Sequence, residues 1–151
     1  MTTERLTRPS DVLSTWAIFD EGLSYLAGRK ELYYNELQAK KLICSMAADH
    51  QRAHVSVVFT DDGDPLAFAL FQENTLPFSN YRTFICRALY YRQGNPTALL
   101  SLFGAFEQWC QQHSVRRYAI QTRRQYRAAL RSFANEKYGF NKLVLVFEKT
   151  L

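Results

Sequence analysis

The sequence predicts an α/β (α+β) domain with a mixed sheet flanked by helices, and three observations lead to this prediction. Two β-rich segments, 54–60 and 65–72, are separated by an acidic, glycine-containing turn, as in an antiparallel hairpin. Segments 82–91 and 117–122 also have strand character, and a helical pattern lies between them, as in a parallel βαβ crossover. Amphipathic helical patterns occur both before the hairpin and after the crossover. We therefore expect the hairpin and the crossover to share one mixed sheet.

The first elements are a short strand and a helix. Residues 6–11 predict a strand that leads into a helix start, because Pro9 disfavours helix just before it and Ser10 or Asp11 can cap the helix that begins there. Apolar residues then recur at three- and four-residue steps, which predicts one helix ending near Gly28. The stripe consists of Val12, Trp16, Phe19, Leu23 and Leu26.

The crossover helix has a clear start signal. Asn95 is a favourable N-cap residue, and Pro96 suits the first helical position, where its missing N–H costs little. Gly139 occupies the position that a helix C-cap favours. The remaining elements are helices over 35–50 and 125–137, the latter ending before Gly139, and a last alternating strand over 142–149.

Length and composition indicate one domain covering 1–151. With 47% hydrophobic and 22% charged residues, the chain has material for a core and lacks the composition of a disordered protein. The sequence shows neither a secretory leader nor an apolar run of the roughly 18 residues that a membrane span needs. Three cysteines without paired spacing and three scattered histidines give no metal-binding pattern. We expect a soluble, cytoplasmic protein without a metal site.

The net charge of +5 raises the question of an anionic partner. Six arginines crowd one stretch, which is compatible with an anion-facing patch or with a solvated helix face. These are Arg116, Arg117, Arg123, Arg124, Arg127 and Arg131. Nucleic-acid binding ranks last among the functions considered, because the stretch lacks regularly spaced stacking aromatics and any recognised reading motif.

The order of elements and the sequence of the C-terminal half resemble the GNAT superfamily of N-acetyltransferases. Residues 97–100 with 106–110 look like the helix after the family's cofactor loop, and 127–140 looks like its last helix and the turn after it. Residues 6–11 match a common family opening. The resemblance implies a mixed, mostly antiparallel sheet with a central, splayed pair of parallel strands, flanked by about four helices.

The resemblance also implies acetyl-CoA as cofactor, with its pyrophosphate on backbone N–H groups at the start of the crossover helix. Tyr91 stands where the family has Gln or Arg, Gly94 keeps the first loop glycine, and Pro96 replaces the second small residue. Proline removes one N–H donor and adds bulk. The implied cofactor-binding residues are Tyr91, Arg92, Gly94, Asn95, Thr97 and Ala98.

The catalytic residues that the family uses are altered here. Strand 82–91 has no acidic residue, so Glu73, just past the hairpin, is the candidate general base, with a solvated strand-end glutamate as the alternative interpretation. The position of the family's acidic tyrosine is Phe133, which carries no transferable proton. Tyr126 is the candidate to replace it, while Tyr138 is expected to pack near Gly139.

Two hypotheses of function arise from the resemblance. In the first, the protein transfers an acetyl group from acetyl-CoA to an amine on a small molecule or a protein, by direct attack on the thioester. In the second, it is an interaction or structural protein that has the GNAT fold, binds a protein partner and has no catalytic activity. Such a protein could be a tailed-phage accessory protein or a component of the phage particle. The two differ in whether the loop 94–97 leaves room for a pyrophosphate.

Overall fold

The computed structural model describes residues 1–29, 33–75, 78, 80–121, 138–140 and 149. The chain divides into two compact units, Met1–Ile120 and Gln121–Leu151. Gly139 in the second unit has a left-handed φ of 69°. The predicted helix 125–137, and almost all of the predicted strand 142–149, lie outside the described residues. That one domain covers 1–151 stays a prediction.

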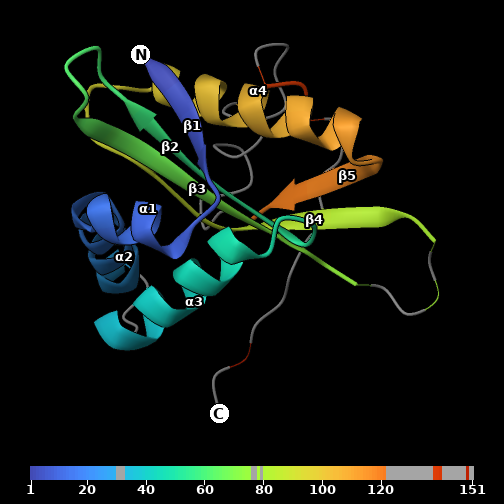
Figure 1. Cartoon of the computed structure of the whole chain (residues 1–151), viewed down its shortest axis with the longest axis horizontal. Helices are drawn as coiled ribbons and strands as arrows, with labels where there is room; N and C mark the ends of the chain where they lie inside the picture. The colour runs from blue at the N-terminus through green and yellow to red at the C-terminus, as the bar shows by residue number, and fades with distance from the viewer. Residues whose placement is uncertain (30–32, 76–77, 79, 122–137, 141–148, 150–151) are drawn as a thin grey trace. The chain divides into compact units, whose positions relative to one another are not determined.

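The first unit is built on a mixed sheet of five strands in the order β1-β2-β3-β4-β5 (Figure 1). The strands are β1 (Thr2–Leu6), β2 (Ala53–Phe59), β3 (Pro65–Glu73), β4 (Arg82–Tyr91) and β5 (Val115–Ile120). Neighbours from β1 to β4 are antiparallel, and β4 pairs with β5 in parallel. The predicted hairpin and crossover are therefore confirmed, and they share one sheet.

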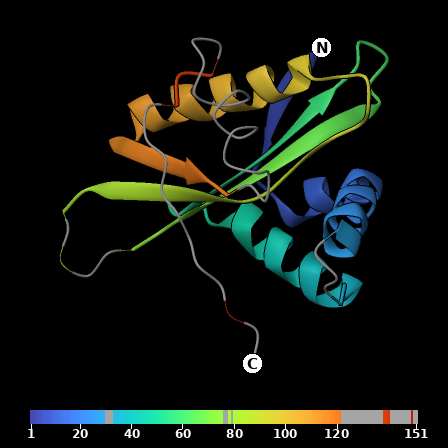
Figure 2. The same ribbon diagram turned by 180° about the vertical axis from the view of Figure 1, so that it is seen from behind.

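Helices cover both faces of this sheet. The first three, α1 (Pro9–Ser14), α2 (Trp16–Arg29) and α3 (Glu36–Ala48), lie on one face, and α4 (Thr97–Gln112) lies on the other (Figures 1 and 2). The mostly antiparallel sheet with about four helices agrees with the predicted fold class. The helix predicted over 35–50 corresponds to α3, and it is capped by the Asn35 side chain, which accepts a 3.0 Å hydrogen bond from the Gln38 amide.

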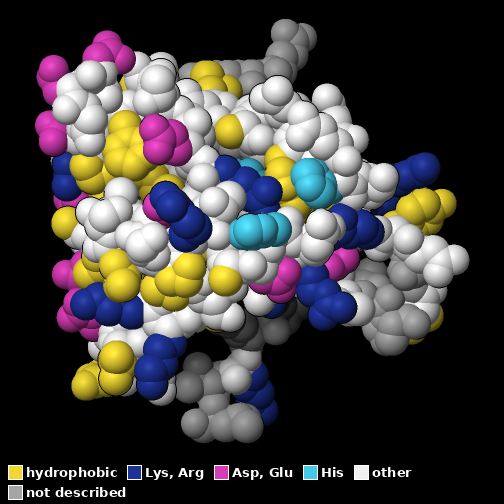
Figure 3. Space-filling view, viewed as in Figure 1, with side chains coloured by type: hydrophobic (Ala, Val, Ile, Leu, Met, Phe, Trp, Pro, Cys, Tyr) yellow, Lys and Arg dark blue, Asp and Glu magenta, His cyan; other side chains and the backbone are white. Residues whose placement is uncertain are grey.

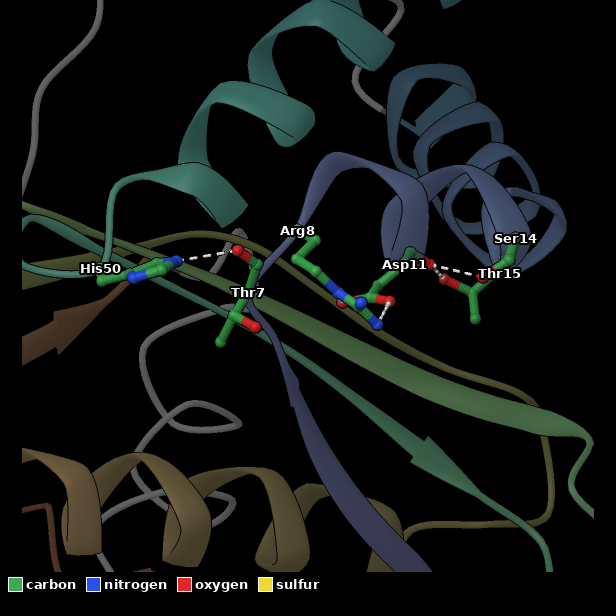
Figure 4. Close-up of polar contacts among 6 residues, drawn as sticks. All are labelled: Thr7, Arg8, Asp11, Ser14, Thr15 and His50. Atoms are coloured by element: carbon green, nitrogen blue, oxygen red, sulfur yellow. Dashed lines mark hydrogen bonds and ion pairs between the residues drawn. The ribbon is translucent and has the colours of Figure 1, made fainter.

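The segment predicted as one helix ending near Gly28 is in fact two helices, α1 and α2. Thr15 breaks it with φ −109° and ψ 17°, while its hydroxyl donates to the carbonyl of Asp11 at 2.8 Å (Figure 4). The expected caps are also wrong, because α1 begins at Pro9 and neither Ser10 nor Asp11 caps it. The Asp11 carboxylate instead accepts two hydrogen bonds from the Arg8 guanidinium, at 2.9 and 3.2 Å.

Each face of the sheet has its own core. Under α1 to α3 the core is largely aliphatic, around the fully buried Phe19 and Phe68. Under α4 it is aromatic. Its members are His54 on β2, Phe71 on β3, Phe84 on β4, Phe106 and Trp109 on α4, and Tyr118 on β5. Phe71 and Phe106 stack with ring centroids 3.7 Å apart, so the α4 helix is fixed on the sheet at the level of the β4–β5 pair.

Candidate functional site

The parallel pair β4–β5 is closed at one end and open at the other. Its ladder runs from Arg82 opposite Val115 to Cys86 opposite Ile120. Beyond Cys86, residues 87–91 of β4 have no β5 partner in the part of the chain that the structure describes. On its other edge β4 stays paired with β3 as far as Tyr91, which lies opposite Ala67. Among the described residues, therefore, one edge of β4 has no strand partner over residues 87–91.

A β-bulge lies where the two strands part. Leu70 of β3 pairs with Ala88 and Phe71 pairs with Cys86, which leaves Arg87 as an extra residue on β4. A bulge bends its strand and increases the local twist. The exposed Arg87 side chain donates to the Oε1 of Gln72 at 3.1 Å. The bulge thus coincides with the end of the β4–β5 ladder that the described residues form.

The open end leads into a tight turn with a glycine in a left-handed conformation. The Asn95 amide donates to the Arg92 carbonyl at 3.2 Å, and Gly94 between them has φ 88°. A positive φ at the third residue is what a type II turn requires, and glycine adopts it without strain. A Cβ placed on Gly94 would meet no atom within 4 Å. The turn therefore borders open space, which fits the approach of an anionic group to the backbone.

The start of α4 supplies only part of the expected N–H donors. The helix begins at Thr97, one residue later than predicted, although Pro96 already has helical angles of −65° and −23°. Ala98 donates its amide to the Asn95 carbonyl at 3.1 Å, and Pro96 has no amide hydrogen. Among the described residues no backbone carbonyl accepts from the amides of Gly94 and Thr97. These two amides remain as donors beside a helix N-terminus that favours anions.

Arg92, the cation nearest the turn, is engaged elsewhere. Its Nε lies 2.8 Å from the Oε2 of Glu21 on α2. Its amide continues the β3–β4 pairing by donating to the Leu66 carbonyl at 3.0 Å. Arg92 lies at the start of the Gly94 turn, and the sequence gives no sign of its contact with α2.

The two predicted catalytic residues are not brought together by the described structure. Glu73 lies opposite Phe84, in the closed half of the β4–β5 pair, and its Oε1 is 3.1 Å from the Nε of Arg82. It stands roughly 23 Å along the strand from Tyr91, counting seven residues from Phe84. Tyr126 lies outside the described residues.

The residue at the separation point is Cys86, whose side chain is buried. Burial raises the pKa of its thiol to about 12, so it stays protonated at neutral pH. It is therefore a packing residue and a poor nucleophile. The features that sequence reasoning missed here are the Arg87 bulge and the Glu21–Arg92 pair, and neither has a local sequence signal.

A shallow cavity of about 280 Å³ lies at the closed end of the strand pair, away from the Gly94 turn. It is lined by Tyr81, Arg116 and Arg117, with the Arg116 guanidinium 5.4 Å from the centroid of the Tyr81 ring. On the face seen in Figure 3, Lys and Arg side chains alternate with acidic ones and form no continuous basic surface. The other four arginines of the basic stretch lie outside the described residues.

Neither a metal site nor a membrane-spanning helix is found in the part of the chain that the structure describes. Within these residues, no group of three His, Cys, Asp or Glu side chains comes together as a metal site would need. Among the described helices, none has the length and apolar character to cross a membrane.

Comparison with solved structures identifies the class of fold. A probable acetyltransferase has a TM-score of 0.74 and 16% identity, covering 100% of this chain and 97% of that one. An aminoglycoside 6′-N-acetyltransferase from Acinetobacter baumannii has a TM-score of 0.67 and 11% identity, covering 99% and 98%. An aminoglycoside acetyltransferase from an uncultured soil metagenomic sample, solved with sisomicin, has a TM-score of 0.69 and 15% identity, covering 99% and 95%.

These similarities show that the chain has the GNAT-like fold of acetyltransferases, as the sequence predicted. No protein-family model matches the sequence, and no curated protein matches it significantly. At such low identity the likeness defines the fold, and the chemistry has to be argued from the site.

Proposed function

We propose that the protein is an acyl-CoA-dependent N-acyltransferase that transfers an acetyl group to an amine. The observation that carries the proposal is the end of the described β4–β5 ladder at Cys86, directly beside the bulge at Arg87. A strand edge without a partner among the described residues, a glycine turn and a helix N-terminus then follow one another along a short stretch of chain. A long ligand with an amide-containing arm and a phosphate end matches that series of features.

The residues at the open end divide into two groups by what they offer such a ligand. The β4 edge before the turn offers backbone N–H and C=O groups, with Tyr91 as its last residue. The turn and the first residue of α4 offer the amides of Gly94 and Thr97 to the pyrophosphate. The Asn95 amide closes the turn on the Arg92 carbonyl at 3.2 Å, and the Asn95 carbonyl accepts from the Ala98 amide at 3.1 Å. Bound acetyl-CoA would supply the thioester whose acetyl group the amine takes.

The general base and the general acid are the remaining parts of the proposed mechanism. Glu73 remains the base predicted from the sequence, but its contact with Arg82 favours a structural role. An amine that binds already neutral needs no dedicated base, because positioning beside the thioester supplies most of the acceleration. Tyr126 remains the proposed acid.

An amine on a small molecule is the acceptor class with which a search begins. Two of the three similar structures described above are aminoglycoside acetyltransferases, and one of these was solved with sisomicin. A protein amine is the second class to examine.

Titration calorimetry of the purified protein with acetyl-CoA tests the proposal. We expect micromolar binding that weakens at least tenfold in Gly94→Ala, because the substitution strains a left-handed residue and fills the space beside the turn. Gly63→Ala is the matched control, since Gly63 in the β2–β3 turn has the same φ of 88° and equally open surroundings. Equal affinities in the two variants, or no binding at millimolar acetyl-CoA, would reject the proposal.

A second candidate is an interaction protein that kept the fold and lost the cofactor. Two observations favour it: Pro96 offers no N–H, and Arg92 is paired with Glu21. This candidate predicts that acetyl-CoA gives neither heat nor a thermal shift. Capture experiments for protein partners would come after that result.

A further inference from the structure

The Glu21–Arg92 ion pair connects the middle of α2 with the residue directly after β4. The Arg92 side chain is 39% exposed and the Glu21 side chain 42%. Arg92 also forms the first residue of the turn that holds Gly94. The pair is thus a contact between two segments 71 residues apart in sequence, at the open end of the strand pair.

The Glu21 carboxylate affects a second side chain at this end of β4. Burial and then the negative charge of Glu21 raise the pKa of Tyr90, while Arg92 acts in the opposite direction. The Tyr90 ring packs against the ring of Tyr25 on α2, with centroids 5.7 Å apart, so α2 lies on the last residues of β4. Glu21 therefore stands close enough to the end of β4 to control the charge that the turn presents.

We propose that Glu21 is a positioning residue that competes with the cofactor's phosphates for Arg92 and thereby sets the affinity for the cofactor. The inference rests on the proposed function. A partly exposed ion pair is weak, and a phosphate offers a guanidinium more charge and a matching bidentate geometry. The Arg92 side chain can therefore exchange Glu21 for a phosphate. The binding free energy that Arg92 contributes is reduced by the free energy of the ion pair with Glu21 that must first be broken.

A double-mutant cycle on Glu21 and Arg92 tests this competition. Calorimetry with CoA, and separately with inorganic pyrophosphate, is performed on the wild type, Glu21→Gln, Arg92→Gln and the double variant. We expect Glu21→Gln to bind CoA about three- to tenfold more tightly and Arg92→Gln to bind it several-fold less tightly. In the Arg92→Gln background, Glu21→Gln should have no further effect.

Asp20→Asn is the matched control, because it removes the same charge from the neighbouring position of α2. Asp20 accepts a hydrogen bond from the Tyr34 hydroxyl at 2.9 Å and has no contact with Arg92. The control should leave the CoA affinity unchanged. Thermal unfolding of all variants reports whether any of them has lost the fold.

The outcomes separate this inference from the proposed function. CoA binding by the wild type with the same affinity in Glu21→Gln rejects the inference and leaves the function standing. A gain that persists without Arg92, or that Asp20→Asn reproduces, also rejects it, since general electrostatics then explains the result. Tighter CoA binding by Glu21→Gln than by the wild type, with the gain lost in the Arg92→Gln background, supports it. If neither binds CoA, both are rejected.

Discussion

The guanidinium of Arg82 donates from Nε to the Glu73 carboxylate at 3.1 Å, and its other nitrogens donate to the carbonyls of His113 and Gln51. One side chain thus connects the end of β3, the start of β4, the end of α4 and the loop before β2. Both Arg82 and Glu73 are mostly buried, with 27% and 19% of their side chains exposed. Breaking such a partly buried network leaves polar groups without partners.

We expect Arg82→Met to lower the free energy of unfolding by about 2–4 kcal/mol and Glu73→Gln by about 1 kcal/mol. The glutamine keeps an oxygen that can accept from Arg82, whereas the methionine leaves three acceptors unpaired. Urea unfolding measures both values. Arg116→Met is the control, because Arg116 is exposed and a surface change of this kind stays within about 0.5 kcal/mol. Similar losses in all three variants would contradict the network.

Glu73→Gln also separates the structural role of Glu73 from the role of base. If the carboxylate is structural, the acetylation rate at saturating substrate should fall less than about tenfold, with an unchanged pH profile. A general base contributes about 10²- to 10⁴-fold, and its loss removes the acidic limb of the profile. A loss of that size in a folded variant would show that Glu73 is the base after all.

Two glycines in helices should respond to alanine in opposite directions. A Cβ on Gly22 of α2 would lie 2.5 Å from the ring of Phe68 and 2.6 Å from that of Tyr90, whereas one on Gly104 of α4 meets no atom within 4 Å. We expect Gly22→Ala to destabilise by about 1–3 kcal/mol through overpacking. Gly104→Ala should stabilise by about 0.5–1 kcal/mol, since alanine favours helix. Thermal denaturation gives both values, and stabilisation by Gly22→Ala would contradict the close approach of α2 to the sheet.

Most of the described fold could be predicted from the sequence because local pattern and tertiary structure agree there. The strand 82–91 has its predicted bounds, and the helix predicted over 35–50 is found as α3, Glu36–Ala48. The break at Thr15 could not be predicted, because one irregular residue leaves the apolar spacing of the helix almost unchanged.

The candidate site was predictable only where a residue type requires a particular backbone. Gly94 is such a case, since its left-handed φ demands glycine. The Arg87 bulge was not predictable, because half-buried strands carry no pattern that marks one extra residue. The pairing of Arg92 with Glu21 depends on how α2 lies on β4, and nothing near Glu21 in the sequence reports that contact.

The free energy of unfolding should decrease as the pH falls through the range between the unfolded-state and folded-state pKa values of His54. Its side chain is 2% exposed, and in the described structure its Nδ1 has no hydrogen-bond partner. Burial, followed by the charge of Arg5, lowers the pKa of His54 from 6.5 to about 3. The folded state thus keeps the ring neutral while the unfolded state takes up a proton below about pH 6.5. The contribution of the neutral His54 ring to stability is complete above that pH and is lost as the pH falls towards 3.

We expect a loss of about 1 kcal/mol per pH unit between pH 6 and 4, measured by urea unfolding. His54→Phe should reduce this slope, because a phenyl ring keeps the aromatic packing and does not titrate. The acidic groups whose pKa values are lowered, such as Asp61 and Asp11, lose their contribution at lower pH and should do so in both proteins. An equal slope in the variant between pH 6 and 4 would show that His54 does not control it.

Replacing Pro96 tests whether the turn lacks a donor that the cofactor could use. Pro96 has helical backbone angles directly before α4, so an alanine there can adopt the same conformation and adds one N–H beside the helix N-terminus. We expect Pro96→Ala to bind acetyl-CoA about three- to tenfold more tightly, as one added hydrogen bond to a charged group would give. The variant should also lose up to about 1 kcal/mol of stability, because the unfolded chain gains freedom. Pro65→Ala, at the first residue of β3, controls for that entropic effect and should leave the affinity unchanged. If Pro96→Ala binds no better than the wild type, the missing amide is not what limits the site.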